Sequence, residues 1–285
     1  MKLNRHFNVN TYLDETLSYL LENEPLNNLM LGVCNRMKNI PDYYGDVYMA
    51  TVKENDELVL AALMTIPQKL MVYSSKSDCD EAIDLLVKDL LKENIYIPGV
   101  IGPKELAKRT CEIWSKYVDC KVRLDMNMRV YELREVNKEV IGEGVLRPIE
   151  EKDIDLVARW IYEFINETSV DGPVTIEECY ETTKRKIENK NHFVLEHEGK
   201  VVSMAAKGRT TENGAAISLV YTPKELRGKG YATTCVALLS QKLLDDGYKF
   251  CALFTDLSNP ISNSIYMKIG YKPLEDFDTY TIEKI

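Results

Sequence analysis

The chain has 285 residues, of which 45% are hydrophobic and 28% charged, a balance typical of a globular protein that can bury a core. The net charge of −9 is spread evenly, since residues 1–135 carry 17 basic and 21 acidic side chains and the remainder 19 and 24. No basic patch or tail points to nucleic acid as a partner. The N-terminus is polar and no apolar run approaches the ~20 residues of a membrane span, so we expect no signal peptide, anchor or membrane partner.

The cysteines and histidines argue against a disulfide framework and a metal centre. The seven cysteines are odd in number and scattered without C-x-x-C spacing, which predicts reduced thiols in the cytoplasm. Of the three histidines, His192 and His197 lie five residues apart in an expected strand, where their side chains point to opposite faces. We therefore expect no metal cofactor.

The first half of the chain reads as alternating helices and strands. Helices with an apolar stripe are predicted at 12–21, 26–37, 77–92 and 103–117. Strands are predicted at 47–53, 58–65, 70–73, 95–101 and 121–133. The helix that follows the expected cap at Ser77 and Asp78 should bury one face, formed by Ile83, Leu86, Val87 and Leu90.

A charged segment with two glycines, residues 134–144, separates this half from a second set of elements. We place the domain boundary there, with one domain at 1–134 and another at 145–285. Strands are predicted at 145–149, 192–198, 201–206, 215–221, 250–255 and 271–282. Four helices are predicted: one that begins at residue 152, one over 175–188, one that ends at residue 246 and one over 260–269. Both halves run in the order two helices, two or three antiparallel strands, helix, strand, helix, strand, which predicts an α/β (α+β) fold with a weak internal duplication.

The most informative stretch follows the strand at 215–221, where the chain breaks at Thr222 and Pro223 and passes through the loop 227–232 into a helix. The loop reads RGKGYA, with two glycines, an arginine and a lysine. Glycine lets the backbone approach a ligand, and the first turn of a helix presents N–H groups with a partial positive charge. A strand, a basic glycine-rich loop and a helix together predict a phosphate site built from backbone.

The spacing of the loop excludes two common nucleotide sites. A dinucleotide fingerprint needs a third glycine where Thr233 stands, and the P-loop pattern is absent. What remains is R-x-x-G-x-A at Arg227, Gly230 and Ala232. Here the sequence resembles the GNAT superfamily of acyl-CoA-dependent N-acyltransferases, in which such a loop holds the coenzyme A pyrophosphate. A simple helix entry is the alternative.

A second segment, 253–271, strengthens the resemblance. On the helix at 260–269, Asn259, Asn263 and Tyr266 fall on one face, which we expect to face away from the core as a ligand wall. The isoleucines Ile261, Ile265 and Ile269 should face the core on the opposite side. A solvated polar face is the alternative. In the GNAT superfamily this helix carries a similar pattern, which Asn259, Ser262, Tyr266, Gly270 and Tyr271 match in register.

The resemblance covers about residues 145–285 and implies a tandem GNAT-like fold with a mixed central sheet flanked by helices. It implies acetyl-CoA as cosubstrate, Tyr266 as the acid that protonates the leaving thiolate, and strand backbone near Val220 as donor to the oxyanion. The implied cosubstrate residues are Leu219, Val220, Tyr221, Arg227, Gly228, Lys229, Gly230, Tyr231, Ala232, Thr233, Asn259, Asn263 and Tyr266.

The general base and the acceptor stay open. Many GNAT relatives place a glutamate on the strand before the loop, whereas this strand reads AAISLVY. Glu163, Glu167 and Asp171 are candidate replacements acting through water. The alternative for each of them is an ordinary charged side chain in solvent. We expect transfer of an acetyl group to a primary amine of a small molecule or peptide. A larger acyl donor, an amino-acid acceptor and a CoA-binding regulatory or scaffold protein without turnover are the alternatives.

The first half departs from the pattern and resembles a degenerate GNAT half. After its third strand the chain reads YSSKSD, residues 73–78, with neither glycine nor arginine. Asp78, Asp80 and Glu81 would repel a pyrophosphate at the following helix start. We expect this half to bind no CoA and to complete the core, cover the acceptor cleft or hold a homodimer contact.

Overall fold

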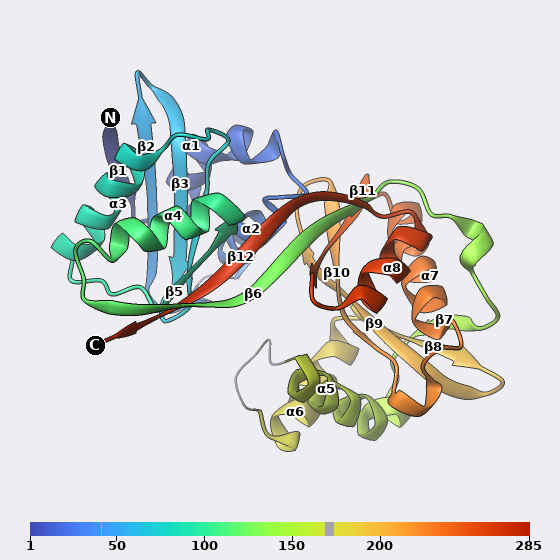
Figure 1. Ribbon diagram of the computed structural model, residues 1–285. Coiled ribbons are helices and arrows are strands. Elements are labelled where there is room, and N and C mark those ends of the chain that lie inside the picture. Colours follow the sequence, from blue (N-terminus) through green and yellow to red (C-terminus); the bar gives the residue numbers. More distant parts are fainter. Residues whose placement is uncertain (41, 169–173) are drawn as a thin grey trace. The chain divides into compact units, whose positions relative to one another are not determined.

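The structure is a computed structural model that describes residues 1–40, 42–168 and 174–285 (Figure 1). The chain forms two compact units. The first unit comprises Met1–Val130, Phe254–Asn259 and Pro273–Ile285, and the second comprises Tyr131–Leu253 and Pro260–Lys272. The C-terminal residues thus belong to the first unit, which the sequence did not predict.

The elements repeat in one order along the chain. The first series is β1 (Lys2–His6), α1 (Val9–Leu21), α2 (Asn28–Asn39), β2 (Val47–Glu54), β3 (Glu57–Thr65), β4 (Leu70–Tyr73), α3 (Asp80–Lys92), β5 (Gly99–Pro103), α4 (Lys104–Trp114) and β6 (Cys120–Leu133). The second is β7 (Val145–Pro148), α5 (Ile154–Thr168), α6 (Ile176–Glu188), β8 (His192–His197), β9 (Lys200–Thr210), β10 (Gly214–Tyr221), α7 (Tyr231–Asp245), β11 (Phe250–Asp256), α8 (Pro260–Ile269) and β12 (Lys272–Lys284). Short 3₁₀ turns lie at Lys138–Val140, Glu151–Asp153 and Lys224–Leu226. The predicted mixed α/β architecture with a duplicated element order is confirmed.

The strands of the first unit lie in the order β1-β2-β3-β4-β5-β12-β6. The strand β12 pairs antiparallel with β5, from Phe277 opposite Pro103 to Thr281 opposite Gly99. The strands of the second unit lie in the order β6-β11-β10-β9-β8-β7, where only the end of β6 belongs to this unit. The last strand of the first series, β6, thus lies between β12 and β11 of the second series. The last strand of the second series, β12, lies between β5 and β6 of the first series.

Hydrophobic stripes of the helices account for the core of the first unit. The predicted face of α3 is fully buried, because Ile83, Leu86, Val87 and Leu90 have no exposed surface. They pack with Trp114 of α4 and with the side chains of β2, β3 and β5. The helices α1 and α2 form a separate cluster on the alternate side chains of β2, β3 and β4. Burial of this apolar surface on both faces of the sheet stabilises the unit.

In the second unit the two faces of the sheet carry different helices. Leu195, Ala205 and Ile217 belong to the same apolar cluster as the buried side of α7. Their strand neighbours Val194 and Met204 belong to a second cluster with α5 and α6. Successive side chains of a strand point to opposite faces, so α7 and α8 cover one face of β8–β10 and α5 and α6 the other (Figure 1).

Several predicted element boundaries differ from the structure, and one strand was not predicted. That strand is Lys2–His6, in which each residue pairs with β2. The helix expected from the cap at Ser77 begins at Asp80 instead, with Cys79 preceding it and no side-chain cap. The Ser74 hydroxyl donates to the Val59 carbonyl at 2.7 Å, so the preceding segment is tied to β3 and does not enter the helix.

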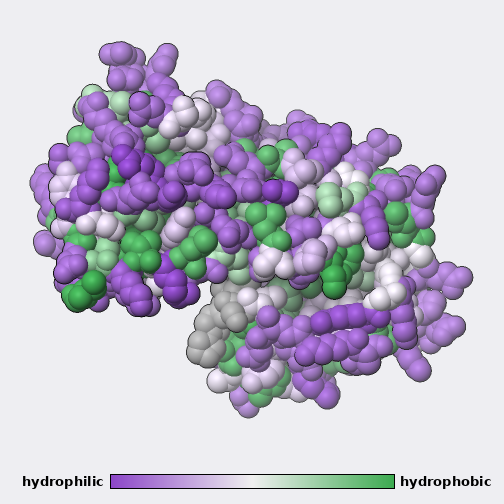
Figure 2. Space-filling model, in the orientation of Figure 1, coloured by the Kyte–Doolittle hydropathy of each residue, from purple (hydrophilic) through white to green (hydrophobic). Residues whose placement is uncertain are grey.

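The surface drawn in Figure 2 is mostly hydrophilic, with small separate apolar areas. Within residues 1–40, 42–168 and 174–285, no helix combines the length and the apolar character that crossing a bilayer requires.

A buried ion pair fastens β7 to the start of α5. The Arg147 guanidinium donates to both carboxylate oxygens of Asp153, at 2.6 and 3.0 Å, and the Glu150 N–H donates to the same carboxylate at 2.8 Å. Burial raises the pKa of Asp153, but these donors outweigh it and hold the pKa below its usual range. The ionised carboxylate is thereby part of the folded state.

Replacing Asp153 by Asn should lower the free energy of unfolding by about 2 kcal/mol, because Arg147 loses its two charged hydrogen bonds to Asp153 and keeps only Glu196, at 2.8 Å, as a counter-charge. The stabilisation requires the ionised carboxylate, so it is present above the unfolded-state pKa and is lost as the pH falls through the lower folded-state pKa. Urea unfolding at neutral and acidic pH measures both effects. Asp155→Asn, at an exposed position of the same helix, is the control and should cost well under 1 kcal/mol. Equal losses in the two variants would contradict the assignment.

Candidate active site

The strand β10 parts from its parallel neighbour β11. The two pair from Gly214 opposite Phe250 to Ala216 opposite Ala252, and they form no further pair, although β10 continues to Tyr221 and β11 to Asp256. From Ile217 onward the edge of β10 that would face β11 has no strand partner among the described residues. An unpaired strand edge offers backbone N–H and C=O groups to an extended ligand.

A bulge interrupts β10 within this unpaired stretch. Its register to β9 runs from Ser218 opposite Ala206 to Tyr221 opposite Met204, so β10 holds one extra residue. Leu219 has a φ of +50°, a left-handed conformation that costs a residue with a Cβ about 1–2 kcal/mol. Such strain and such bulges concentrate at functional sites, where they re-aim backbone and side chains.

The predicted phosphate loop follows directly. Gly228 and Gly230 have φ values of +80° and +84°, and a Cβ at either would meet no atom within 4 Å. No N–H from Gly228 to Thr233 donates to any residue in the described part of the chain, and α7 has no side-chain cap. Consecutive free N–H groups at a helix start with left-handed glycines form a concave anion site. The loop geometry therefore suits a phosphate group.

The Arg227 side chain is held by helix α5. Its Nη2 donates to Glu167 at 2.7 Å and its Nε to the Thr222 carbonyl at 2.8 Å. Its guanidinium lies 5.5 Å from the centre of the Tyr221 ring. Burial raises the pKa of Glu167, but the hydrogen bond and charge of Arg227 and the charge of Lys224 hold it below the usual value. In this structure the loop is thus linked to α5 by an ion pair that the sequence did not predict.

The helix α8 has the predicted bounds and buries Ile269 as expected, but it also buries polar side chains that were expected to face away from the core. Asn263 and Tyr266 are each only 9% exposed, whereas Ile261 is 72% exposed, so the expectation of a solvent-side polar face was wrong. The reason is Tyr131 at the end of β6, whose hydroxyl donates to the side-chain amide oxygen of Asn263 at 3.0 Å. Its ring lies 6.4 Å from that of Tyr266. A buried polar group is tolerated when it is hydrogen-bonded, so α8 can turn Asn263 inward.

The Tyr266 hydroxyl is available for proton transfer. It makes no hydrogen bond to the residues that the structure describes, and burial raises its pKa to about 12. The phenol is therefore protonated at neutral pH, with its proton uncommitted. A protonated hydroxyl in an apolar cluster is suited to act as a general acid.

The predicted site residues fall into three groups. The first group comprises Leu219–Tyr221 and Arg227–Thr233, which lie within the stretch 219–233 of the second unit. Asn263 and Tyr266 lie on α8 in the same unit, where Tyr266 and Val220 share one apolar cluster. Asn259 is exposed and belongs to the first unit, so its role as a CoA ligand stays a prediction.

The three candidate bases are now distinguishable. The Tyr221 hydroxyl donates to Glu163 at 2.8 Å, and Glu167 is engaged with Arg227 and lies 3.6 Å from Lys224. Asp171 lies outside the described residues. Sequence reasoning found these carboxylates but missed Tyr221 as their partner, because its orientation depends on the bulge.

The matching segment of the first unit is built differently. The strand β4 pairs with β3 in regular register, from Ala61 opposite Tyr73 to Leu63 opposite Met71, without a bulge. In the following loop the Ser75 N–H donates to the Tyr19 hydroxyl at 2.7 Å and the Lys76 N–H to the Ser74 hydroxyl at 3.1 Å. Two backbone donors of this loop are thus already used, and the segment 74–79 contains no glycine.

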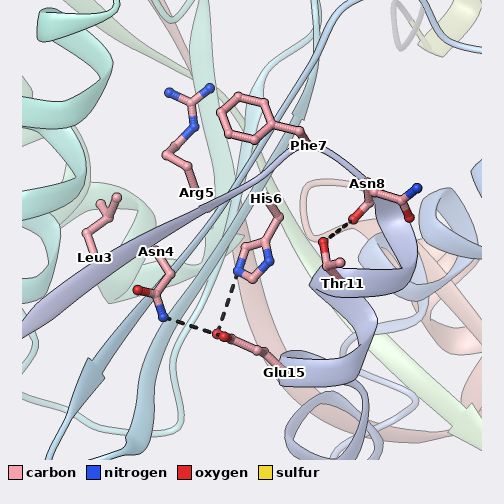
Figure 3. A pocket seen from close by; sticks show the side chains of 8 residues that line it. All are labelled: Leu3, Asn4, Arg5, His6, Phe7, Asn8, Thr11 and Glu15. Atoms are coloured by element: carbon pink, nitrogen blue, oxygen red, sulfur yellow. Dashed lines mark hydrogen bonds and ion pairs between the residues drawn. The ribbon is translucent and has the colours of Figure 1, made fainter.

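The first unit holds a hollow of about 660 Å³ beside β1 and the start of α1 (Figure 3). The Glu15 carboxylate at its wall accepts from Thr51 at 2.8 Å and lies 3.1 Å from the Lys53 ammonium. His6 contacts the Thr51 hydroxyl at 3.0 Å, and burial lowers its pKa. These polar groups satisfy one another, and the hollow is open, so its size alone does not make it a catalytic site.

Among the described residues, no group of three or more His, Cys, Asp or Glu side chains has an arrangement that could hold a metal ion.

With this geometry in view, the comparison with family models identifies the family of one domain. Residues 161–271 match the model of the acetyltransferase (GNAT) family. The chain therefore carries a GNAT-family acetyltransferase domain, as the loop and the helix α8 predicted. No curated protein sequence matches the chain.

Solved structures extend the likeness to the whole chain. A tandem GNAT protein from the clavulanic acid biosynthesis pathway is 12% identical, with a TM-score of 0.60 over 99% of this chain and 98% of its own. A GNAT-family acetyltransferase from Colwellia psychrerythraea is 12% identical, with a TM-score of 0.57 over 100% of both chains. A Drosophila protein is 12% identical, with a TM-score of 0.65 over 98% of both. At such identities the likeness shows the fold, which is that of a tandem GNAT protein.

We expect Gly230→Asp to weaken CoA binding about 100-fold, because an added carboxylate repels phosphate and obstructs the N–H groups of the loop. The control is Gly199→Asp in the β8–β9 turn, where φ is +71° and a Cβ likewise meets no atom within 4 Å. It carries the same backbone strain and should bind CoA like the parent chain. Calorimetry with CoA should give one site per chain for the parent. Unchanged affinity in Gly230→Asp, or two equivalent sites, would refute this assignment.

Proposed function

We propose that this chain is a cytoplasmic N-acetyltransferase that moves an acetyl group from acetyl-CoA to a primary amine of a small molecule or peptide. The observation that carries the proposal is the parting of β10 from β11 at Ala216, followed by the bulge at Leu219 and the free N–H groups from Gly228 to Thr233. The scattered, odd-numbered cysteines favour a reducing compartment.

In this proposal the backbone binds the cosubstrate. The N–H groups of the loop 228–233 hold the pyrophosphate, and the free edge of β10 from Leu219 to Tyr221 pairs with the amides of the pantetheine arm. Arg227 and Lys229 add positive charge beside the phosphates. The bound thioester supplies an activated acyl carbon with a thiolate as leaving group.

The residues around the thioester assist the transfer at two atoms. Backbone N–H near Val220 donates to the oxygen on which negative charge develops. Tyr266 donates its hydroxyl proton to the departing sulfur, and its pKa of about 12 keeps that proton in place until the thiolate forms. A thiolate leaves readily, so positioning of amine and thioester contributes much of the rate.

One observation favours a second function, namely a CoA-binding protein that has lost turnover. The strand β10 carries no carboxylate where many GNAT proteins have their base. A larger acyl donor or an amino-acid acceptor remains compatible with the same site. Glutamates beside Tyr221 offer an alternative base, which keeps the enzymatic function first.

The decisive measurement is thiol release from acetyl-CoA in the presence of spermidine, lysine, tryptamine and a peptide with a free N-terminus, run beside calorimetry with CoA. Amine-dependent thiol release establishes the acetyltransferase. CoA binding without release on any of these amines would favour the non-enzymatic function.

Tyr266→Phe should lower kcat about ten- to a thousand-fold while leaving acetyl-CoA binding unchanged, because only the donated proton is lost. Tyr271→Phe is the matched control, since that ring lies 5.9 Å from Tyr266 and its hydroxyl bonds Ser240 at 2.8 Å. The control should lose about 1 kcal/mol of stability and keep its kcat. Parent-like turnover in Tyr266→Phe would show that another group protonates the sulfur.

A further inference from the structure

We infer that Tyr221 and Glu163 form a proton relay that takes the first proton from the acceptor amine, a role that rests on the proposed acetyltransferase function. The loop and α8 account for binding and for the acid, but not for the base. A primary amine is largely protonated at neutral pH, so a nucleophile has to be generated.

The bulge in β10 decides where Tyr221 points. In an uninterrupted strand, residues 217, 219 and 221 would share one face. Ile217 indeed lies in the cluster of α7, but Tyr221 lies in the cluster of α5 and α6. The extra residue between Ser218 and Tyr221 shifts the alternation by one, and the side chain turns to the opposite face.

The two proposed proton-transfer groups therefore lie on opposite faces of β10. Tyr266 packs with the cluster of α7, on the face where the phosphate loop begins its helix. Tyr221 packs against Trp160 of α5, with ring centres 6.1 Å apart. A cosubstrate that enters over the α7 side leaves the α5 side to the amine, so Tyr221 stands on the acceptor's side.

Of the nearby carboxylates, Glu163 is the one suited to receive the proton. The Tyr221 hydroxyl donates to it at 2.8 Å, against 3.4 Å to Glu167. Glu167 is already bound by Arg227 and faces Lys224, which makes it a poor proton acceptor. The charged groups around the Tyr221 hydroxyl are thus Glu163 and Glu167 from α5 and Lys224 and Arg227 from the segment after β10.

The relay moves one proton without leaving charge on the tyrosine. The ammonium N–H proton passes to the Tyr221 oxygen as the Tyr221 proton passes to Glu163, which gives a neutral amine and a neutral carboxylic acid. Burial and the bond to Glu163 raise the pKa of Tyr221, so the hydroxyl stays protonated before and after the step. Glu163 is exposed and returns the proton to solvent. The amine nitrogen then bonds the acyl carbon, and the carbon–sulfur bond breaks as Tyr266 gives its proton to the sulfur. The second proton lost by the nitrogen passes to solvent, and solvent returns a proton to Tyr266.

The test compares Tyr221→Phe, Glu163→Gln and the double variant in the thiol-release assay, using whichever panel amine the parent chain acetylates. Each single variant should lose about 100-fold in kcat/KM at pH 7, with CoA affinity unchanged. Because the groups act in series, the double variant should lose no more than either single one. The deficit should shrink towards pH 10, where the amine deprotonates without help. Glu188→Gln, an exposed glutamate at the end of α6, is the control and should match the parent chain.

The outcomes separate the relay from the proposed function. Turnover by the parent with normal rates in Tyr221→Phe and Glu163→Gln overturns the relay alone. A pH-independent deficit, or losses that multiply in the double variant, also overturns it, because a merely structural role gives that result. No turnover by the parent chain despite CoA binding overturns the proposed function, and the relay with it.

Discussion

The site depends on one constraint, the parting of two parallel strands. After Ala216 the strand β10 has no partner in β11, and its backbone groups are left without the hydrogen bonds that a sheet normally supplies. An extended ligand can satisfy them, which a closed sheet would forbid. The left-handed Leu219 stores strain at this edge, whereas the glycines of the following loop adopt a left-handed conformation without strain. In the proposed function, binding in this segment therefore rests on backbone, and few side chains of the loop are needed for it.

The bulge links binding to chemistry. By adding one residue to β10 it turns Tyr221 away from the face that α7 and Tyr266 occupy. In the proposed mechanism, one strand thereby separates an acid on one face from a proton acceptor on the other. The ion pair between Arg227 and Glu167 joins the loop to α5 and reserves Glu163 for Tyr221. Loss of the bulge would therefore affect the binding edge and the relay together.

The two units share an element order but not this segment. In the first unit β4 pairs regularly with β3, and two loop N–H groups donate to Tyr19 and Ser74. This segment has neither the bulge nor the left-handed glycines of its counterpart in the second unit. The contrast within one chain illustrates that one fold can carry different local backbone features.

The sequence by itself determined the features that local chemistry controls. Glycines at 228 and 230 predicted a loop before a helix, and Pro260 and Gly270 marked the ends of α8, because these residues restrict or free the backbone wherever they stand. Only the tertiary structure decided which face of α8 is buried, because that depends on Tyr131, distant in sequence. It also decided that β12 joins the first unit and that Tyr221 meets Glu163. Strand partners and bulges are properties of two segments at once, and periodicity within either segment cannot specify them.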